Sequence, residues 1–288
     1  MNIPDVSAFF DEVTNTVTYL VSDPETKKGA IIDSVLDYEA CSGRTKTTSA
    51  DALINIIEEK NLLIDWILET HAHADHFSAA PYLQKQVGGT IAIGEHISNI
   101  QRVFGGLFNE GDSFRSDGSQ FGHLFSDNEP FKIGNLEAQI MYVPGHTSAC
   151  VAYIIGDAIF VGDTLFMPDF GSARCDFPGG DAGKLYESVQ KIYELPDTTR
   201  MFLCHDYKTK DRDYFAWETT VGEQKRSNVH LNTSVSRTEF VNMRTKRDKE
   251  LAMPKLILPS IQVNMRAGNI PEPEDNGVSY LKIPLNAV

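Results

Sequence analysis

The stretch that decides the fold is Thr70-His-Ala-His-Ala-Asp-His76, in which three imidazoles and one carboxylate fall within six consecutive residues. It follows residues 64–69 (IDWILE), a short apolar run that predicts a buried strand. Alternate side chains of an extended chain point the same way, so His71 and His73 are expected to converge on one point. The last two residues of the motif are expected to open a helix. Since imidazole and carboxylate are ligands of zinc and of ferrous iron, the stretch predicts a metal site at a strand end.

The second half of the chain repeats this arrangement of a strand followed by a potential ligand. Predicted strands over residues 137–143, 158–161 and 200–204 lead to His146, Asp163 and His205, respectively. Loops at strand ends commonly carry the chemistry of a scaffold. An N-terminal strand over residues 30–33 ends in Asp33, which faces the same region. A partner of the metal ligands is one interpretation of Asp33, and a turn residue is the favoured one. Together with the first motif, these side chains predict one site built from separate strands.

The composition limits the classes of function. The 288-residue chain has a formal net charge of −14, which argues against nucleic-acid binding because that function needs a basic surface. It contains no apolar run long enough to span a membrane, and its first residues lack the basic and apolar parts of a signal peptide. Its four cysteines are scattered without a C-x-x-C pair, which is typical of reduced thiols. We therefore expect a cytoplasmic protein with no nucleic-acid and no membrane partner.

Periodicity and turn residues predict the other elements of the chain. Strands are expected over residues 14–21 and 90–93, and helices over residues 49–60, 96–104 and 234–251, with Ser49 as the N-cap of the first. Residues 254–259 are expected to be extended. Residues 1–230 are expected to form the catalytic domain, because residues 231–288 are rich in proline and charge and too few to bury a separate core. This C-terminal segment is expected to pack on the domain, to cover part of the site or to form a homodimer contact.

Four separated motifs resemble, in order and spacing, those of the metallo-β-lactamase superfamily. They are the stretch quoted above, Gly145-His146-Thr147, Gly162-Asp163-Thr164 and Cys204-His205-Asp206, and the resemblance extends over residues 10–225. It implies an α/β fold, an αβ/βα sandwich in which two mixed β-sheets face each other, helices lie outside and the metal lies at one edge. This fold hosts hydrolases, nucleases and oxygenases, so the resemblance to the superfamily leaves the reaction open.

Two glutathione-linked branches of this superfamily are similar to the chain: the persulfide dioxygenases, also called sulfur dioxygenases, and glyoxalase II, which hydrolyses S-acyl glutathione thioesters. Ala72 stands where glyoxalase II typically has a third histidine, and Arg174-Cys-Asp-Phe177 and His205-Asp-Tyr207 resemble dioxygenase sequences. Gly171-Ser172-Ala173 and the long C-terminal segment depart from the shorter dioxygenases. The first resemblance implies that O2 oxidises glutathione persulfide to sulfite and glutathione. The second implies a metal-dependent hydrolase of glutathione thiol derivatives.

The same resemblance implies the roles of the ligands. In the dioxygenase branch one Fe(II) per chain is held by His71, His146 and Asp163, a set that leaves three coordination positions open. The residues expected to orient these ligands are His73, Asp75, His76 and His205. In the hydrolase branch the ion is zinc, one or two per chain: His71, His73 and His146 hold the first, Asp75, His76 and His205 the second, and Asp163 bridges them. Both schemes use the same seven residues, so the choice between them stays open.

The resemblance also implies residues that contact the substrate. Glutathione carries two carboxylates, and a guanidinium binds carboxylate through a bidentate fork. Arg174 matches a family arginine on the loop that follows Asp163, where it would be free to reach a bound tripeptide. Tyr207 is the expected polar contact near the iron, and Arg226 and Arg266 are further candidates. A metal-binding protein without catalysis is a third hypothesis, which metal content and oxygen uptake would separate from the two enzymes.

Overall fold

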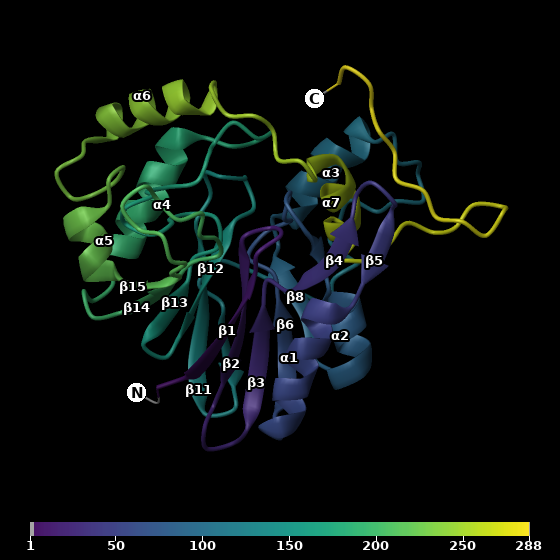
Figure 1. Ribbon diagram of the computed structural model, residues 1–288, viewed down its shortest axis with the longest axis horizontal. Coiled ribbons are helices and arrows are strands. Elements are labelled where there is room, and N and C mark those ends of the chain that lie inside the picture. Colours follow the sequence, from purple (N-terminus) through teal and green to yellow (C-terminus); the bar gives the residue numbers. More distant parts are fainter. Residues whose placement is uncertain (1–2, 288) are drawn as a thin grey trace.

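The computed structural model describes residues 3–287 and contains two six-stranded β-sheets that face each other, with helices on their outer sides (Figure 1). The first sheet contains, in spatial order, β1 (Asp5–Asp11), β2 (Thr16–Ser22), β3 (Lys28–Ile32), β6 (Leu63–Leu68), β8 (Thr90–Gly94) and β9 (His123–Phe125). The second contains β10 (Pro130–Ile133), β11 (Leu136–Tyr142), β12 (Val151–Ile155), β13 (Ala158–Phe160), β14 (Arg200–Phe202) and β15 (Glu218–Thr220). A small sheet contains β5 (Arg44–Lys46), β4 (Val35–Glu39) and β7 (Phe77–Ser78).

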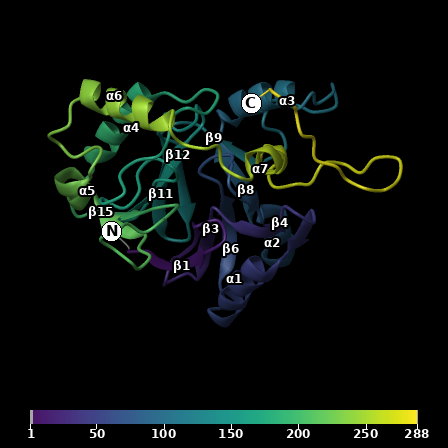
Figure 2. The same ribbon diagram turned by 45° about the horizontal axis from the view of Figure 1, so that its top comes forward.

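The helices lie mainly on the outer sides of the two large sheets. They are α1 (Thr48–Glu59), α2 (Ala80–Val87), α3 (Ile97–Leu107), α4 (Ala182–Tyr193), α5 (Val221–Ser227), α6 (Arg237–Asp248) and α7 (Ile257–Asn264). In α1, Leu53 and Ile57 lie one turn apart and are buried in a cluster with Ile67 of β6. On the other side of the sandwich, Val189 of α4 is buried in a cluster with Met201 of β14. Figure 2 shows the two helical layers on opposite sides of the strands.

The interior of the sandwich is formed where the two sheets meet. All seven residues of β2 are buried, a pattern typical of a strand covered on both faces. Tyr19 of β2 contacts Phe160 and Phe202 of the facing sheet, with ring centroids 5.3 and 5.4 Å away. Both sheets are mixed, because β3, β6 and β8 pair in parallel, β1 and β2 pair in antiparallel, and β13 is parallel to β14 but antiparallel to β12. The expected αβ/βα sandwich is therefore confirmed.

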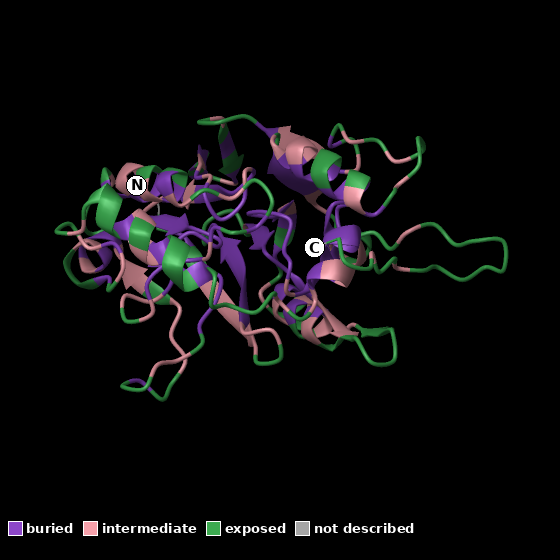
Figure 3. Cartoon of the chain, turned by 90° about the horizontal axis from the view of Figure 1, so that it is seen from above, coloured by how far each residue is buried: buried purple, intermediate pink, exposed green. Residues whose placement is uncertain are grey.

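The C-terminal segment is joined to the histidine motif. Helix α6 packs against α4, and α7 lies beside β7. The side chain of Asn264 donates to the backbone carbonyls of His73 and His76, both at 2.8 Å, and accepts from the backbone N–H of Ser78 at 2.9 Å. After α7 the chain forms an arm that extends away from the sandwich and is exposed along most of its length (Figure 3). Within residues 3–287, no helix is long and apolar enough to cross a bilayer.

Some predicted elements are wrong in their bounds or type. The helix after the histidine motif begins at Ala80, not within the motif, because β7 first pairs with β4. Thr47 takes the N-cap position of α1, whereas Ser49 lies inside the helix and binds a carboxylate of β4. Residues 257–259 begin α7 although they were expected to be extended, since a proline in the first turn of a helix is tolerated. The strands predicted around residues 64–69, 90–93, 137–143, 158–161 and 200–204 are confirmed as β6, β8, β11, β13 and β14.

Candidate metal centre

The seven residues predicted for the metal site gather at one edge of the sandwich, where several strands end. His71, His73, Asp75 and His76 lie in the loop between β6 and β7, and His146, Asp163 and His205 follow β11, β13 and β14. Asp163 lies centrally among them: its Oδ2 is 3.6 Å from His146 Nε2 and 4.0 Å from His71 Nε2. Its Oδ1 is 3.3 Å from His205 Nε2. The fold therefore brings together side chains that are up to 134 positions apart in the sequence (205 − 71).

Three of these residues, which we call the triad, form one compact group: the potential ligand atoms of His71, His146 and Asp163 lie within 4.8 Å of one another. His146 Nδ1 donates to the backbone carbonyl of Arg174 at 2.8 Å, so its Nε2 carries the lone pair. His71 Nδ1 donates to the hydroxyl of Thr70 at 3.0 Å, since that hydroxyl itself donates to a buried carboxylate. Burial lowers the pKa of His71 well below its ordinary value, which keeps the imidazole neutral. Both histidines thus present a ligand nitrogen.

The triad fits a divalent metal ion. Among residues 3–287, His71 Nε2 finds no hydrogen-bond partner although it is buried. A buried polar atom without a partner costs roughly 1–3 kcal/mol, so a ligand that satisfies it stabilises the site. Two imidazoles and one carboxylate are a set that binds zinc or non-heme iron. The residues therefore suit the metal that the sequence predicts, and they do not by themselves select the ion.

His73 lies next to the triad but faces other partners. Its ring centroid is 4.1 Å from that of His71. Its Nε2 donates to Asp33 at 2.9 Å and lies 3.5 Å from Oε2 of Glu69. Burial alone would lower the pKa of His73, but Asp33 and Glu69 raise it well above its ordinary value. The expected convergence of the first two motif histidines is therefore only partly correct, since their rings adjoin while their Nε2 atoms serve different groups.

Asp33 belongs to the site, so its favoured interpretation as only a turn residue is wrong and the alternative, a partner of the metal ligands, agrees with its contacts. Its backbone does have the positive φ of a turn, 53°. It follows β3, which runs parallel to β6, so both strands direct their carboxyl ends to the same edge. The carboxylate accepts from the backbone N–H and the hydroxyl of Thr70, each at 2.8 Å, in addition to His73. An aspartate directly after a buried strand was the available signal, but an ordinary turn gives the same pattern.

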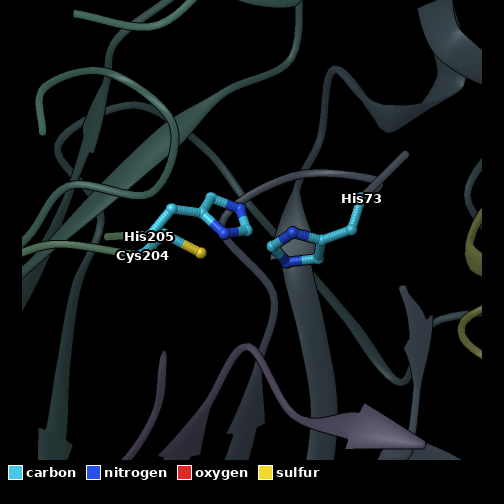
Figure 4. Close-up of side chains that lie close together, drawn as sticks. All are labelled: His73, Cys204 and His205. Atoms are coloured by element: carbon cyan, nitrogen blue, oxygen red, sulfur yellow. The ribbon is translucent and has the colours of Figure 1, made fainter. Parts of the chain in front are cut away.

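A second cluster lies on the other side of Asp163. His205 Nε2 is 3.5 Å from Oδ2 of Asp75. Burial alone would lower the pKa of His205, but the carboxylates of Asp163 and Asp75 raise it above its ordinary value. Figure 4 shows the imidazoles of His73 and His205 pointing toward each other from separate segments, with the thiol of Cys204 beside them. Burial raises the pKa of this thiol, which therefore stays protonated.

A cavity of about 710 Å³ opens onto these side chains. Aromatic rings form part of its wall: the ring centroid of Tyr207 is 5.1 Å from that of Phe170, and Phe177 is 5.0 Å from the imidazole of His146. Four positively charged side chains also line it, namely Arg174, Arg244, Arg247 and Lys255. A ligand of this catalytic cavity is expected to combine negative charge with apolar surface.

The structure places the four predicted substrate-binding residues in different environments. Tyr207 and Arg174 are among the described residues that line the cavity, whereas Arg226 and Arg266 lie elsewhere. Arg226 lies on the surface of α5 and pairs with a glutamate of the same helix. Arg266 pairs with Glu110 at 2.7 Å. Neither of these two arginines lines the cavity, so their prediction as substrate contacts is not supported.

Arg174 is not free in the way that its loop position suggested. Its Nε and Nη2 donate to the two oxygens of Asp176 at 2.6 and 2.7 Å. Its Nη1 donates to the backbone carbonyl of Ala252 at 2.7 Å, and the guanidinium lies 5.0 Å from the ring centre of Phe177. The arginine therefore links the loop after Asp163 to the C-terminal segment while it lines the cavity.

Arg212 supports the site but was missed from the sequence. Its Nη1 and Nη2 donate to the two oxygens of Asp206 at 2.6 and 2.7 Å, and its Nε donates to Asp169 at 2.8 Å. Since Asp206 directly follows His205, this network fixes the segment that carries the histidine. Arg212 stands in a polar run without periodicity, so no pattern marked it.

Comparisons with known proteins agree with this site. Residues 12–205 match the family described as the Metallo-beta-lactamase superfamily. The chain is 53% identical over 293 residues to a probable metallo-hydrolase of Burkholderia pseudomallei, covering 98% of this chain and 99% of that protein. It is 50% identical over 287 residues to glyoxylase B2 of Dictyostelium discoideum, covering 99% and 98%. It spans 65% of the length of a further relative, a beta-lactamase hydrolase-like protein of Xylella fastidiosa.

A relative and a solved structure bear the name ETHE1. The chain is 29% identical over 262 residues to the human mitochondrial persulfide dioxygenase ETHE1, covering 90% of this chain and 87% of that protein. The crystal structure of ETHE1 from Myxococcus xanthus superimposes with a TM-score of 0.73 and 27% sequence identity. The superposition covers 92% of this chain and all of that chain. The names of these relatives thus include both branches that the sequence resembles.

Proposed function

This chain belongs to the metallo-beta-lactamase superfamily, and on that premise we propose that it is a persulfide dioxygenase with one Fe(II) per chain. In the proposed reaction, glutathione persulfide, O2 and water give glutathione, sulfite and two protons. The family match and the ligand groups at the sheet edge support a metal-dependent enzyme of this superfamily.

The grouping of ligand atoms is the observation that supports a single iron. The triad forms one compact group, whereas His73 groups with Asp75 and His76, with Cys204 and His205, and with Asp33 and Glu69. In the two-zinc scheme, His73 would instead share a metal with the histidines of the triad, and Asp75 and His76 would share the other with His205. The observed grouping therefore fits a mononuclear site of two imidazoles and one carboxylate.

The proposed roles of the chain's own residues follow from their contacts. Iron held by the triad would supply redox chemistry and open positions for O2 and for the persulfide sulfur. Thr70 orients one histidine of the triad through its Nδ1, and the carbonyl of Arg174 orients the other. Loss of hydration and the carboxylate of Asp163 raise the pKa of Tyr207 well above its ordinary value. Its phenol therefore stays protonated and can donate a hydrogen bond to an anion in the cavity.

Arg174 remains the proposed contact for a glutathione carboxylate. Its Nη1 donates to a neutral acceptor, the carbonyl of Ala252, while Nε and Nη2 serve Asp176. A charge-assisted hydrogen bond is roughly twice as strong as a neutral one, so a substrate carboxylate competes favourably with a carbonyl for Nη1. In this proposal substrate binding also loosens the contact between Arg174 and the C-terminal segment.

A metal-dependent hydrolase of S-acyl glutathione thioesters is the second candidate. Nδ1 of His73 and Nε2 of His76 are buried without hydrogen-bond partners among residues 3–287. The first is therefore available to the metal that His71 and His146 would hold, and the second to a further metal. The names of the Burkholderia and Dictyostelium relatives also favour this candidate. In this candidate Nε2 of His73 keeps its hydrogen bond to Asp33 while Nδ1 binds the metal.

The two candidates are separated by supplying each substrate to freshly purified protein. The proposal predicts oxygen uptake with glutathione persulfide, with one sulfite formed for each O2 consumed. An S-acyl glutathione should release its thiol no faster than it does without protein. Thioester hydrolysis without persulfide-dependent oxygen uptake would replace the proposal with the hydrolase.

A further inference from the structure

A second space lies beside the catalytic cavity, and we call it the side groove. It is a groove of about 890 Å³ between the β4–β5 hairpin, residues 253–263 and residues 279–286. One part of its wall contains Tyr38 and Phe77, whose rings stack with centroids 4.1 Å apart. Another part is the C-terminal arm, which the side chain of Gln262 holds through two hydrogen bonds to the backbone of Lys282, at 2.8 and 2.9 Å.

The side groove adjoins the catalytic cavity. Tyr38, Ala40, Pro254 and Lys255 line both spaces. The two spaces therefore lie next to each other along these four residues. The catalytic cavity alone, at about 710 Å³, already falls within the range of roughly 300–1,000 Å³ that holds small molecules. The side groove can therefore accommodate a further part of a ligand, one that a glutathione molecule bound in the catalytic cavity does not have.

The lining of the side groove is suited to hydrocarbon. Its aliphatic side chains include Ile257, Leu258, Val263, Ile270 and Leu281. Among the described residues that line it none is acidic, although the chain contains 40 aspartates and glutamates. Its charged members are two lysines, one of them at the junction with the catalytic cavity. Apolar surface of this kind gains free energy when hydrocarbon displaces water from it.

We propose that the side groove binds the hydrocarbon part of a thiol-derived substrate whose sulfur lies at the metal centre. The inference rests on the proposed function in one respect, the assignment of thiol-derived substrates to the catalytic cavity. The shared wall of the two spaces selects this occupant, because a chain attached to a sulfur in the catalytic cavity would enter the groove past the residues that both spaces share. The substrate class then includes persulfides of alkyl thiols as well as glutathione persulfide.

The test measures binding without turnover. Isothermal titration calorimetry of the iron-loaded protein, kept free of oxygen, is carried out with linear alkanethiols from ethanethiol to octanethiol. Affinity should rise about fourfold for each methylene that enters the groove. Ile270→Lys should abolish this increase of affinity with chain length, because Ile270 lines only the side groove. Ethanethiol should bind the variant as tightly as it binds the wild type.

A matched control lies on the same arm. Val278 is 48% exposed and Ile270 is 49% exposed, but Val278 lines neither space, so Val278→Lys should keep the rise in affinity. Equal affinities along the thiol series in the wild type, or the same rise in Ile270→Lys, would overturn the proposal. So would a change of oligomeric state in Ile270→Lys with the rise intact, which would make the groove a contact between copies.

Oxygen uptake with glutathione persulfide is recorded on the same preparations, so that the two proposals fail separately. A rise in thiol affinity without oxygen uptake supports the side groove and removes the proposed dioxygenase function. Oxygen uptake without any dependence on chain length removes the side groove alone.

Discussion

The two sides of the metal centre hold their imidazoles in different ways. On one side, Nδ1 of His71 faces a hydroxyl and Nδ1 of His146 faces a backbone carbonyl, and burial lowers the pKa of His71. Their Nε2 atoms lie 4.0 and 3.6 Å from Asp163. On the other side, Nε2 of His73 donates to Asp33 at 2.9 Å and Nε2 of His205 lies 3.3 Å from Asp163. Burial alone would lower the pKa of both imidazoles, but these carboxylates raise it above its ordinary value. One side of the site therefore provides ligand nitrogens for a metal ion, and the other side holds protonated histidines next to carboxylates.

The largest expected effect comes from the triad. Replacing His71, His146 or Asp163 by alanine removes one of three proposed ligands and should abolish iron binding and oxygen uptake. Iron per chain, measured by elemental analysis, is the readout. His73→Ala is the comparison on the charged side and should keep most of its iron. If His73→Ala and His71→Ala lost the metal equally, the distinction between the two sides would be broken.

The next effect concerns the carboxylate that holds the charged side. Asp33→Asn removes the negative charge that faces His73 and should lower the free energy of unfolding of the metal-free protein by about 3 kcal/mol near pH 6, since breaking a buried ion pair is costly. Chemical denaturation of the wild type and the variant measures this difference. A difference below about 0.5 kcal/mol, within the range of ordinary surface substitutions, would show that the pair does not stabilise the fold.

The same pair predicts how this difference depends on pH. Burial alone would raise the pKa of Asp33, but His73 and Thr70 lower it below 3.8, so its contribution is present above pH 3.8 and lost as pH falls through the folded pKa. The pKa of His73 is raised above 6.5, so its contribution is present below pH 6.5 and lost as pH rises through the folded pKa. The difference between wild type and Asp33→Asn should therefore be largest between pH 4 and 6.5 and should shrink on both sides. A difference that stays constant with pH would contradict a charged pair.

Removing the outer members of the charged side should have a smaller effect on the metal. Asp75→Ala and His76→Ala should keep substantial iron, because neither belongs to the triad, while kcat/KM falls about 10–100-fold, as is typical for groups that orient ligands. Iron content and oxygen uptake on one preparation test this. Loss of most of the iron from Asp75→Ala would indicate that two metals share the site.

The smallest expected effect concerns Arg174. Arg174→Ala should lower kcat/KM for glutathione persulfide about 10-fold, mainly through KM, if its guanidinium binds a substrate carboxylate. Lysine should restore part of the loss, because it keeps the charge without the bidentate fork. Arg226→Ala is the matched control, since that arginine lies on the surface of α5 outside the cavity. A fall in melting temperature and iron content at normal KM would assign Arg174 only to the contacts with Asp176 and Ala252.

Much of the site could be predicted because short segments of the sequence show both where a strand ends and which ligand-type residue follows it. The motif beginning at Thr70 and the residues after β11, β13 and β14 each follow a recognisable strand, and a sheet brings such ends to one edge. The sandwich was implied by the resemblance of these motifs, in order and spacing, to those of the metallo-β-lactamase superfamily. What each imidazole faces could not be predicted in this way, because Nε2 of His73 is directed by Asp33, which is 40 positions away in the sequence.

Contacts with the C-terminal segment were also beyond the reach of the sequence. Arg174 is held by Ala252, and Asn264 binds two carbonyls of the histidine motif, yet neither pairing has a local pattern. Residues 257–259 were predicted to be extended because prolines stand at positions 254 and 259. These residues instead begin α7, whose Ile257 and Ile261 are buried in the core. Long-range packing decides such positions, and local propensity does not.

We propose that the triad holds one iron per chain through Nε2 of His71, Nε2 of His146 and the carboxylate of Asp163. Elemental analysis of freshly purified wild-type protein, with iron and zinc determined against protein concentration, tests it most directly. We expect about one iron and little zinc per chain. Two zinc ions per chain, with little iron, would contradict this expectation and would favour a second metal held by Asp75, His76 and His205.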